Sequence, residues 1–331
     1  MKTIKTILII TLTTLCLWKT NSQGDIPVNL NLSQTMIEPA TYRASNCIQS
    51  TQSLHAKTTY MAGNEIVLNP GFEVAINAKF EALTGNDYRY RLSVITYNIK
   101  KGHYSGNGNV IHESGADVAA VQEIRFGFNN FKNLKNSAKM EGVGCATIGS
   151  TTVGYGIALL WKSWLGTPTI CKDTVHVTDS DEIRGYIIAE WSDFAVISTH
   201  LSTNENSRKK MANKILAESI VQNCISTGKP IYFAGDANEE PHTTTGAVNI
   251  FNNAGFDVLN NPARNYQYNH NGVWGYWYDD ATTAKGKMID LIMEYNTNSN
   301  KELLERGIPS CADFNYVLSD HLPYLVKVKI Q

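Results

Sequence analysis

Polar side chains gather at the ends of apolar runs in this chain, and this pattern most constrains its fold. Four short polar cassettes end apolar runs, a fifth lies inside one, and a sixth precedes the alternating run from Tyr324 to Ile330. The cassettes are Thr96-Tyr97-Asn98, Val121-Gln122-Glu123, Ser198-Thr199-His200, Gly235-Asp236-Ala237-Asn238, Met288-Ile289-Asp290-Leu291-Ile292 and Val317-Leu318-Ser319-Asp320-His321-Leu322-Pro323. Because open α/β sheets collect ligands at strand ends, the pattern predicts one site built from distant segments.

Strand-like and helix-like segments alternate from Tyr88 onward. The stretch from Ser207 to Cys224 places apolar residues on one helical face and is followed by Gly228, so it predicts a helix. Strands joined by hairpins and helices, with polar residues at their ends, favour an α/β fold. We predict a four-layer α/β sandwich of two packed mixed β-sheets with outer helices.

The N-terminus has the layout of a secretory signal peptide. Lys2 and Lys5 precede an apolar run from Ile7 to Leu17, and small or polar residues follow at 20–22. The run is too short to span a membrane comfortably, which favours a cleaved signal over an uncleaved anchor. We therefore expect a secreted, extracellular or periplasmic protein.

Residues 41–85 differ in sequence pattern from the rest of the chain. Short β-type runs alternate with Ala62-Gly63 and Pro70-Gly71 turns, which predicts a small β-rich module. Its size is below that of a self-sufficient core, so we expect it to dock on a neighbour. The predicted division is a signal peptide over 1–22, a linker over 23–40, this module over 41–85 and a catalytic domain over 86–331.

Composition narrows the ligand classes without selecting one. The formal net charge is −1 and 18% of residues are charged, so the overall charge does not indicate a polyanion binder. This weakens a nucleic-acid function without excluding it, because an enzyme can concentrate positive charge or a metal in one cleft. Five cysteines remain after removal of the signal, an odd number with no C-x-x-C spacing, which argues against structural zinc. They are Cys47, Cys145, Cys171, Cys224 and Cys311, and their pairing is left open.

Buried oxygen donors favour a hard divalent cation. Glu123 ends an otherwise apolar strand, where a carboxylate is costly unless it is paired or holds a cation. Asn98, Glu123 and Asp320 form an oxygen-only set that suits Mg²⁺ or Mn²⁺. The alternative for Glu123 is a structural tie to Arg125 or to backbone amides.

Two further groups of polar residues suggest phosphate chemistry. His200 follows a strand, and Asp236 and Asn238 face one side of an extended segment, which favours a phosphate-facing role over a structural histidine. Asp290 is embedded in an apolar strand and needs a partner, whereas His321 can act as a base only with an orienting carboxylate. We therefore predict that these two residues pair.

The cassettes together resemble the endonuclease/exonuclease/phosphatase (DNase I-like) superfamily of metal-dependent phosphoesterases over residues 88–331. Ala237 departs from the family pattern, which usually has an aromatic residue there, and we expect altered packing rather than lost activity. The 41–85 stretch resembles the three-coathanger stack module of secreted bacterial proteins, through its Ala-Gly, Ile-x-Leu-x-Pro-Gly-Phe and Ala-x-Phe-x-Ala pattern. This second resemblance implies an accessory role.

The family resemblance implies in-line attack of water on a phosphoester. A divalent ion, Mg²⁺ with Mn²⁺ or Ca²⁺ as alternatives, would sit on Glu123 with help from Asn98 and Asp320. His321, oriented by Asp290, would activate the water.

The same resemblance assigns the remaining cassette residues. Asp236 and Asn238 would position the nucleophile and the phosphate, and His200 would stabilise the transition state or protonate the leaving oxygen. Whether His321 or Asp236 takes the proton stays open. Relatives also pair this histidine with a glutamate near position 155, where this chain has Gly154-Tyr155-Gly156.

The substrate is less constrained than the chemistry. Arg125 and Arg184 match positions that contact phosphate in DNase I-like nucleases, so nucleic acid is the favoured substrate and partner. A phospholipid headgroup in a sphingomyelinase-like reaction, or an inositol phosphate, is the alternative. The aromatic run from Trp274 to Tyr278 could pack internally, stack bases or enter a lipid interface. A catalytically silent binding protein is the competing class, and no stable protein partner is predicted.

Overall fold

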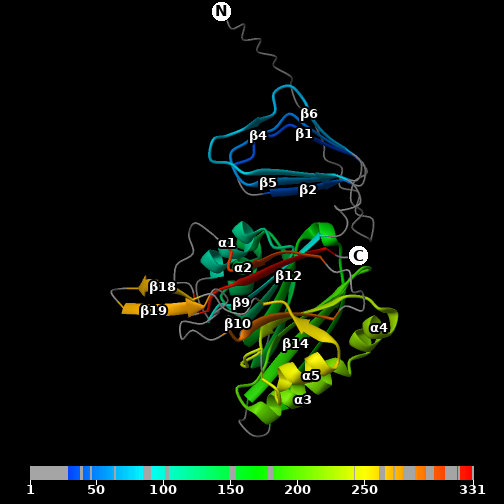
Figure 1. Cartoon of the computed structure of the whole chain (residues 1–331), viewed down its shortest axis with the longest axis vertical. Coiled ribbons are helices and arrows are strands. Elements are labelled where there is room, and N and C mark those ends of the chain that lie inside the picture. Colours follow the sequence, from blue (N-terminus) through cyan, green and yellow to red (C-terminus); the bar gives the residue numbers. More distant parts are fainter. Residues whose placement is uncertain are drawn as a thin grey trace, which may run out of the picture.

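The computed structural model describes two parts of the chain, a small N-terminal stack of strands and a larger α/β domain (Figure 1). The described residues are 29–37, 40–44, 47–62, 65–84, 91–100, 104–148, 154–177, 182–241, 243–260, 265–270, 273–278, 288–295, 302–309, 319 and 321–329. The predicted signal peptide, Cys311 and Asp320 lie outside these residues. Among the described residues, no helix has the length and apolarity needed to cross a membrane.

The N-terminal stack is made of successive coils that lie on one another in parallel register. One three-stranded sheet contains β1 (Asn29–Leu32), β3 (Cys47–Ser50) and β6 (Glu65–Leu68), and another contains β2 (Ala40–Ala44), β5 (Thr58–Ala62) and β8 (Phe80–Thr84). On the third side, β4 (Ser53–Leu54) pairs with β7 (Glu73–Val74), and Met36 bridges Leu54. The β-rich module that the sequence predicts is therefore present.

The stack begins earlier than predicted. Strand β1 falls within the predicted 23–40 linker, yet Asn29 pairs with Cys47 in a parallel ladder. Four alternating residues resemble a polar linker in sequence, and only pairing with the next coil identifies them as a strand. A small apolar core that includes Ile48 and Tyr60 fills the stack, with the ring of Tyr60 edge-on to that of Phe80 at 5.0 Å between centroids.

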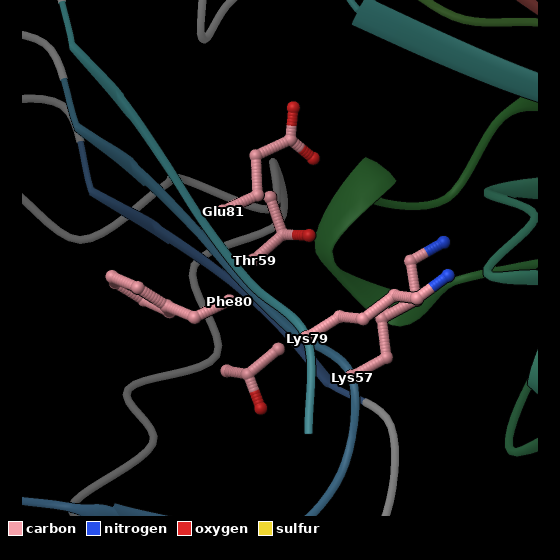
Figure 2. Close-up of a pocket in the computed structure, with 6 residues that line it drawn as sticks. Lys57, Thr59, Lys79, Phe80 and Glu81 are labelled. Carbon is pink, nitrogen blue, oxygen red and sulfur yellow. The ribbon is translucent and has the colours of Figure 1, made fainter. Parts of the chain in front are cut away.

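A hollow of about 350 Å³ lies on the stack (Figure 2). It is lined by Lys57, Thr58, Thr59, Lys79, Phe80 and Glu81. Lys57 and Lys79 come from neighbouring coils, and Figure 2 shows their side chains extending in the same direction. None of the residues that the sequence singles out for catalysis lines this hollow.

The α/β domain contains two six-stranded mixed sheets. The first has the order β11-β12-β10-β9-β22-β21, and the second has the order β13-β14-β15-β16-β20-β17. The strands of the first are β9 (Arg91–Asn98), β10 (Val118–Arg125), β11 (Glu141–Ile148), β12 (Tyr155–Trp161), β21 (Glu302–Gly307) and β22 (Tyr324–Lys329). Those of the second are β13 (Thr169–Val177), β14 (Glu182–Glu190), β15 (Ala195–His200), β16 (Ile231–Asp236), β17 (Phe256–Val258) and β20 (Asp290–Tyr295).

Helices cover the outer face of each sheet (Figure 1). Helices α1 (Tyr104–Ser114) and α2 (Asn130–Ala138) pack on the first sheet, and α3 (Glu205–Leu216), α4 (Ser219–Thr227) and α5 (Ala247–Asn253) pack on the second. Strands covered on both faces become almost continuously apolar: Val94 faces the core between the sheets, whereas Ile95 faces the helices. The predicted four-layer α/β sandwich is confirmed.

The structure corrects one predicted helix and shows the conformation of the aromatic run. The predicted helix from Ser207 to Cys224 is two helices, because Glu218 is extended (φ −64°, ψ 138°) and its carboxylate accepts hydrogen bonds from Tyr186 and Cys171. The backbone of the aromatic run forms β19 (Val273–Tyr278), which pairs with β18 (Asn265–His270) in a separate two-stranded sheet.

Candidate active site

The ends of strands from both sheets bring the polar cassettes together. In the second sheet His200 is opposite Asp236, and Asp236 is opposite Asp290, so three cassettes lie side by side on adjacent strands. In the first sheet Asn98 at the end of β9 lies opposite Gln122, which immediately precedes Glu123 on β10. The two sheets therefore meet at this edge with their polar residues facing one another.

Asn98 links the two sheets chemically. Its Nδ2 donates to Glu123 Oε1 at 3.2 Å and to Asp236 Oδ2 at 3.0 Å, although Asp236 belongs to the other sheet. The side chain is fully buried, and its Oδ1 accepts a hydrogen bond from the Lys100 backbone at 3.0 Å. A single amide thus holds two carboxylates at hydrogen-bond distance.

Glu123 has an unusual backbone conformation. Its φ is +57°, and the pairing of β10 with β12 shifts register between Val121 and Ile124. Positive φ is uncommon outside glycine, and such bulges redirect side chains next to active sites. Burial, followed by the charge of Glu123 and a hydrogen bond to its carboxylate, raises the pKa of Tyr155.

Tyr155 therefore belongs to the candidate site, and sequence reasoning missed it. The family pattern has a glutamate near position 155 that pairs with the histidine at position 200, and Gly154-Tyr155-Gly156 offers none. The partner of Tyr155 is instead Glu123, on the neighbouring strand. The pairing depends on the β10 bulge, so the sequence carries no local signal for it.

The predicted pair of His321 and Asp290 forms. His321 Nδ1 lies 2.7 Å from Asp290 Oδ2, and Asp290 is fully buried. The backbone N–H of His321 donates to Ser319 Oγ at 3.1 Å, and Ser319 Oγ donates to the Asn98 carbonyl oxygen at 2.6 Å. With Nδ1 engaged by a carboxylate, proton transfer to or from the ring falls to Nε2.

Asp236 is the most perturbed carboxyl group of the site. Burial, followed by the nearby charge of Asp290, raises its pKa to about 7. His321, the Asn238 backbone N–H at 2.8 Å from Oδ1 and the Asn98 amide act in the opposite direction. Clusters of buried acids with shifted pKa values are typical of catalytic sites.

His200 lies beside Asp236 as a buried, largely neutral ring. Its Nε2 is 3.4 Å from Asp236 Oδ2. Burial, then the charges of Arg184 and His321, lower the pKa of His200 well below its ordinary value. A neutral imidazole donates a hydrogen bond without adding a full positive charge.

The donor set fits a hard divalent cation. Asp236, Asp290 and His321 can each offer one ligand atom within 4.8 Å of the others, and Glu123 approaches through Asn98. Carboxylate and amide oxygens are the ligands that Mg²⁺ and Ca²⁺ prefer, and burial followed by the charge of Asp290 raises the pKa of Asp236. The structure thus places two candidate metal-facing carboxylates, Asp236 and Asp290, beside the predicted set, whose third member Asp320 lies outside the described residues.

The remaining predicted residues occupy different positions around the site. Arg184 is buried and close enough to influence His200, whereas Arg125 is exposed at the end of β10. Asn238 has a left-handed backbone (φ 49°), and its Nδ2 donates to the Leu201 carbonyl oxygen at 2.9 Å. Arg208 Nε lies 3.4 Å from Oε2 of the buried Glu239.

Comparison with known proteins agrees with this geometry. The model of the "Endonuclease/Exonuclease/phosphatase family" matches residues 95–321. No curated protein sequence matches the chain. A solved family structure from Bacteroides vulgatus is 18% identical, with a TM-score of 0.53, over 73% of this chain and 99% of that one.

Two further solved structures have the same fold. A mannosyl-6-phosphatase from Bacteroides thetaiotaomicron is 15% identical, with a TM-score of 0.54, over 72% of this chain and 99% of that one. The human Nocturnin catalytic domain with bound sulfate is 17% identical, with a TM-score of 0.52, over 73% and 94% of the two chains. At these identities the likeness concerns the fold.

Proposed function

The chain belongs to the endonuclease/exonuclease/phosphatase family, and from this premise we propose that it is a secreted, divalent-metal-dependent phosphodiesterase that cuts nucleic acid. The observation that carries the proposal is the convergence of both sheets on one polar cluster. Asn98 joins Glu123 to Asp236 across the sheets, and the His321–Asp290 pair stands beside Asp236. Phosphoester hydrolysis needs these components, a cation site next to a water-activating base.

The base of the proposed reaction is His321. Asp290 holds its Nδ1 at 2.7 Å, which presents Nε2 to a water molecule for in-line attack. Possible ligand atoms of Asp236, Asp290 and His321 lie within 4.8 Å of one another, so Asp236 is the second candidate to take the proton. Asn238 and Asp236 would position the water and the phosphate.

Glu123, Asn98 and Asp320 would hold the divalent ion, with Mg²⁺ favoured and Mn²⁺ or Ca²⁺ as alternatives. When bound, the ion would neutralise charge on the phosphate and on the leaving oxygen. The residues of this chain keep that face rigid: Asn98 is fully buried, and Tyr155 bonds to Glu123.

Charge that develops on the leaving side would be met by His200 and Arg184. Both are buried, so their hydrogen bonds act in a low dielectric, where they are stronger than in water. His200, as a neutral ring, would donate a hydrogen bond to the leaving oxygen, and Arg184 would supply the positive charge.

Nucleic acid is the substrate that we favour, with exposed Arg125 as a phosphate contact at the end of β10. A phospholipid headgroup or an inositol phosphate is the second candidate. A phosphatase reaction is a further candidate, because one solved structure of the same fold is named a mannosyl-6-phosphatase. In each case export through the signal peptide would place the reaction outside the cytoplasm, with the N-terminal stack as an accessory module.

The test is hydrolysis of double-stranded DNA, RNA and sphingomyelin liposomes by the mature protein, each with Mg²⁺ and with chelator. We expect metal-dependent cutting of DNA or RNA that falls by orders of magnitude in His321→Ala. Release of phosphocholine with nucleic acid untouched would overturn the nuclease assignment and keep the site. A His321→Ala protein as active as the wild type would overturn the assignment of the base.

A further inference from the structure

The loop after β10 presents one phenylalanine to solvent. Phe128 is 97% exposed, whereas Phe126, two residues earlier, is 1% exposed. The buried Phe126 ring lies edge-on to Phe131 with centroids 5.7 Å apart, and the Phe126 backbone N–H donates to the Gly154 carbonyl oxygen. Two of the three phenylalanines of this segment therefore anchor it, and the third stands outside the core.

The backbone around Phe128 is held in a defined shape. Phe128 and Asn129 have φ values of 46° and 61°, a conformation that bulky residues seldom adopt unless their surroundings impose it. Asn130 closes the turn: its backbone N–H donates to the Gly127 carbonyl oxygen at 2.8 Å, and its Nδ2 donates to the Arg125 carbonyl oxygen at 3.1 Å. The backbone that carries the exposed ring therefore has a defined conformation.

The surrounding segment is strongly basic, unlike the whole chain with its net charge of −1. Between Ile124 and Met140 there is no Asp or Glu, and the basic residues are Arg125, Lys132, Lys135 and Lys139. Lys135 is 3.9 Å from Glu141, while Arg125 and Lys132 are exposed on either side of Phe128 along the chain. An aromatic platform between cations is the composition of single-strand binding sites, whereas a lipid anchor needs a larger apolar face.

The segment is also close to the proposed chemistry. Ile124 faces the helix layer, so Arg125, the next residue of β10, points away from that layer. Phe128 is five residues beyond Glu123, at most about 18 Å of extended chain. That length corresponds to about five steps of a nucleic-acid strand at roughly 3.4 Å per step.

We propose that Phe128, flanked by Arg125 and Lys132, is a stacking platform for an unpaired base of single-stranded nucleic acid, a few nucleotides from the phosphate that is cut. The inference rests on the proposed nuclease function and adds the strandedness of the substrate. Stacking on one ring accepts any base, so the platform contributes affinity without sequence preference.

The test is binding of a fluorescent single-stranded oligonucleotide to the His321→Ala protein, measured by anisotropy. We expect Phe128→Ala to weaken binding roughly five- to hundredfold, and Phe128→Trp to retain it. An oligonucleotide that lacks bases should bind the His321→Ala protein equally well with and without Phe128→Ala, because the contact that the substitution removes is base stacking. Lys132→Ala should lower the slope of log affinity against log salt by about 0.7, whereas Lys210→Ala, an exposed lysine on α3, should leave affinity unchanged.

Three results would overturn the inference, and together they distinguish failure of the stacking platform from failure of the nuclease assignment. If the wild type cuts single strands but Phe128→Ala binds them equally well, the platform is wrong and the nuclease stands. If Phe128→Ala loses binding to phosphatidylcholine–sphingomyelin vesicles instead, the occupant is a lipid surface. If the wild type hydrolyses another phosphoester and neither binds nor cuts nucleic acid, both the platform and the nuclease fall while the hydrolase remains.

Discussion

At the scale of single residues, the proposed chemistry depends on one hydrogen bond between His321 and Asp290. The carboxylate is fully buried and 2.7 Å from Nδ1, so it sets the orientation and tautomer of the ring. We expect Asp290→Asn to keep the fold and to lower kcat by roughly 10²- to 10⁴-fold with little change in KM. Steady-state kinetics check this, and a change in KM alone would show that Asp290 acts in binding instead.

Asp236 gives a second prediction at this scale, for the chelated protein. Its pKa is raised to about 7 from an ordinary value near 4, so the folded state keeps a proton that the unfolded state releases. Stability therefore falls as pH rises between about 4 and 7, by a few kcal/mol at most. Asp236→Asn should remove this penalty.

Thermal unfolding at pH 5 and pH 8 measures the effect. The melting temperature of Asp236→Asn relative to wild type should be higher at pH 8 than at pH 5, while its activity should be lost. Added Mg²⁺ should stabilise the wild type more than the variant. A difference between the two proteins that does not change with pH would refute the raised pKa.

At the scale of elements, the spacing of β15 and β16 sets the distance between His200 and Asp236. Gly235 lies opposite Thr199, one residue before that pair, and a Cβ at Gly235 would lie 2.2 Å from the Thr199 carbonyl oxygen. Gly235→Ala must push the strands apart. We expect a loss of about 1–3 kcal/mol in stability and at least a tenfold loss in kcat.

The matched control is Gly142→Ala. A Cβ there would lie 2.4 Å from the end of the Leu160 side chain and 2.9 Å from the Leu159 carbonyl oxygen, a milder clash between β11 and β12, on strands that carry neither His200 nor Asp236. It should lower stability by a smaller amount and leave kcat near the wild-type value below the unfolding temperature. Equal kcat losses in the two variants would mean that strand spacing at the site has no special role.

At the scale of the whole molecule, no disulfide joins the cysteines that the structure describes. All four are free thiols. Cys47 lies in the N-terminal stack, Cys145 lies between the two sheets, and Cys171 and Cys224 lie on the helix side of the second sheet. Burial raises the pKa of Cys145 and, to about 11, that of Cys224, so these thiols should react slowly.

Reductant should therefore leave the melting temperature unchanged within about 1 °C, since a native disulfide typically contributes 2–4 kcal/mol, or several degrees. Alkylation of the denatured, non-reduced protein followed by mass spectrometry should label all four of these cysteines. Protection of any of them would contradict the structure.

Much of the fold and of the site was predictable because the relevant signals are local. Apolar alternation identified the strands, polar cassettes marked their ends, and a buried aspartate inside an apolar run required a partner such as His321. The position of Ala237 also follows from a local signal. Alternation along the strand points it away from Asp236, and it is buried in the core between the second sheet and its helices.

By itself, the sequence determined the four-layer class, the family and the polar residues that we expect to carry the chemistry, because each depends on patterns within a few positions. Only the tertiary structure decided which groups meet. Asn98 reaches Asp236 across 138 positions, Tyr155 reaches Glu123 through a bulge, and β1 becomes a strand only when the next coil pairs with it. These contacts arise from the packing of sheets and coils against one another, and no periodicity along the chain encodes such a distance.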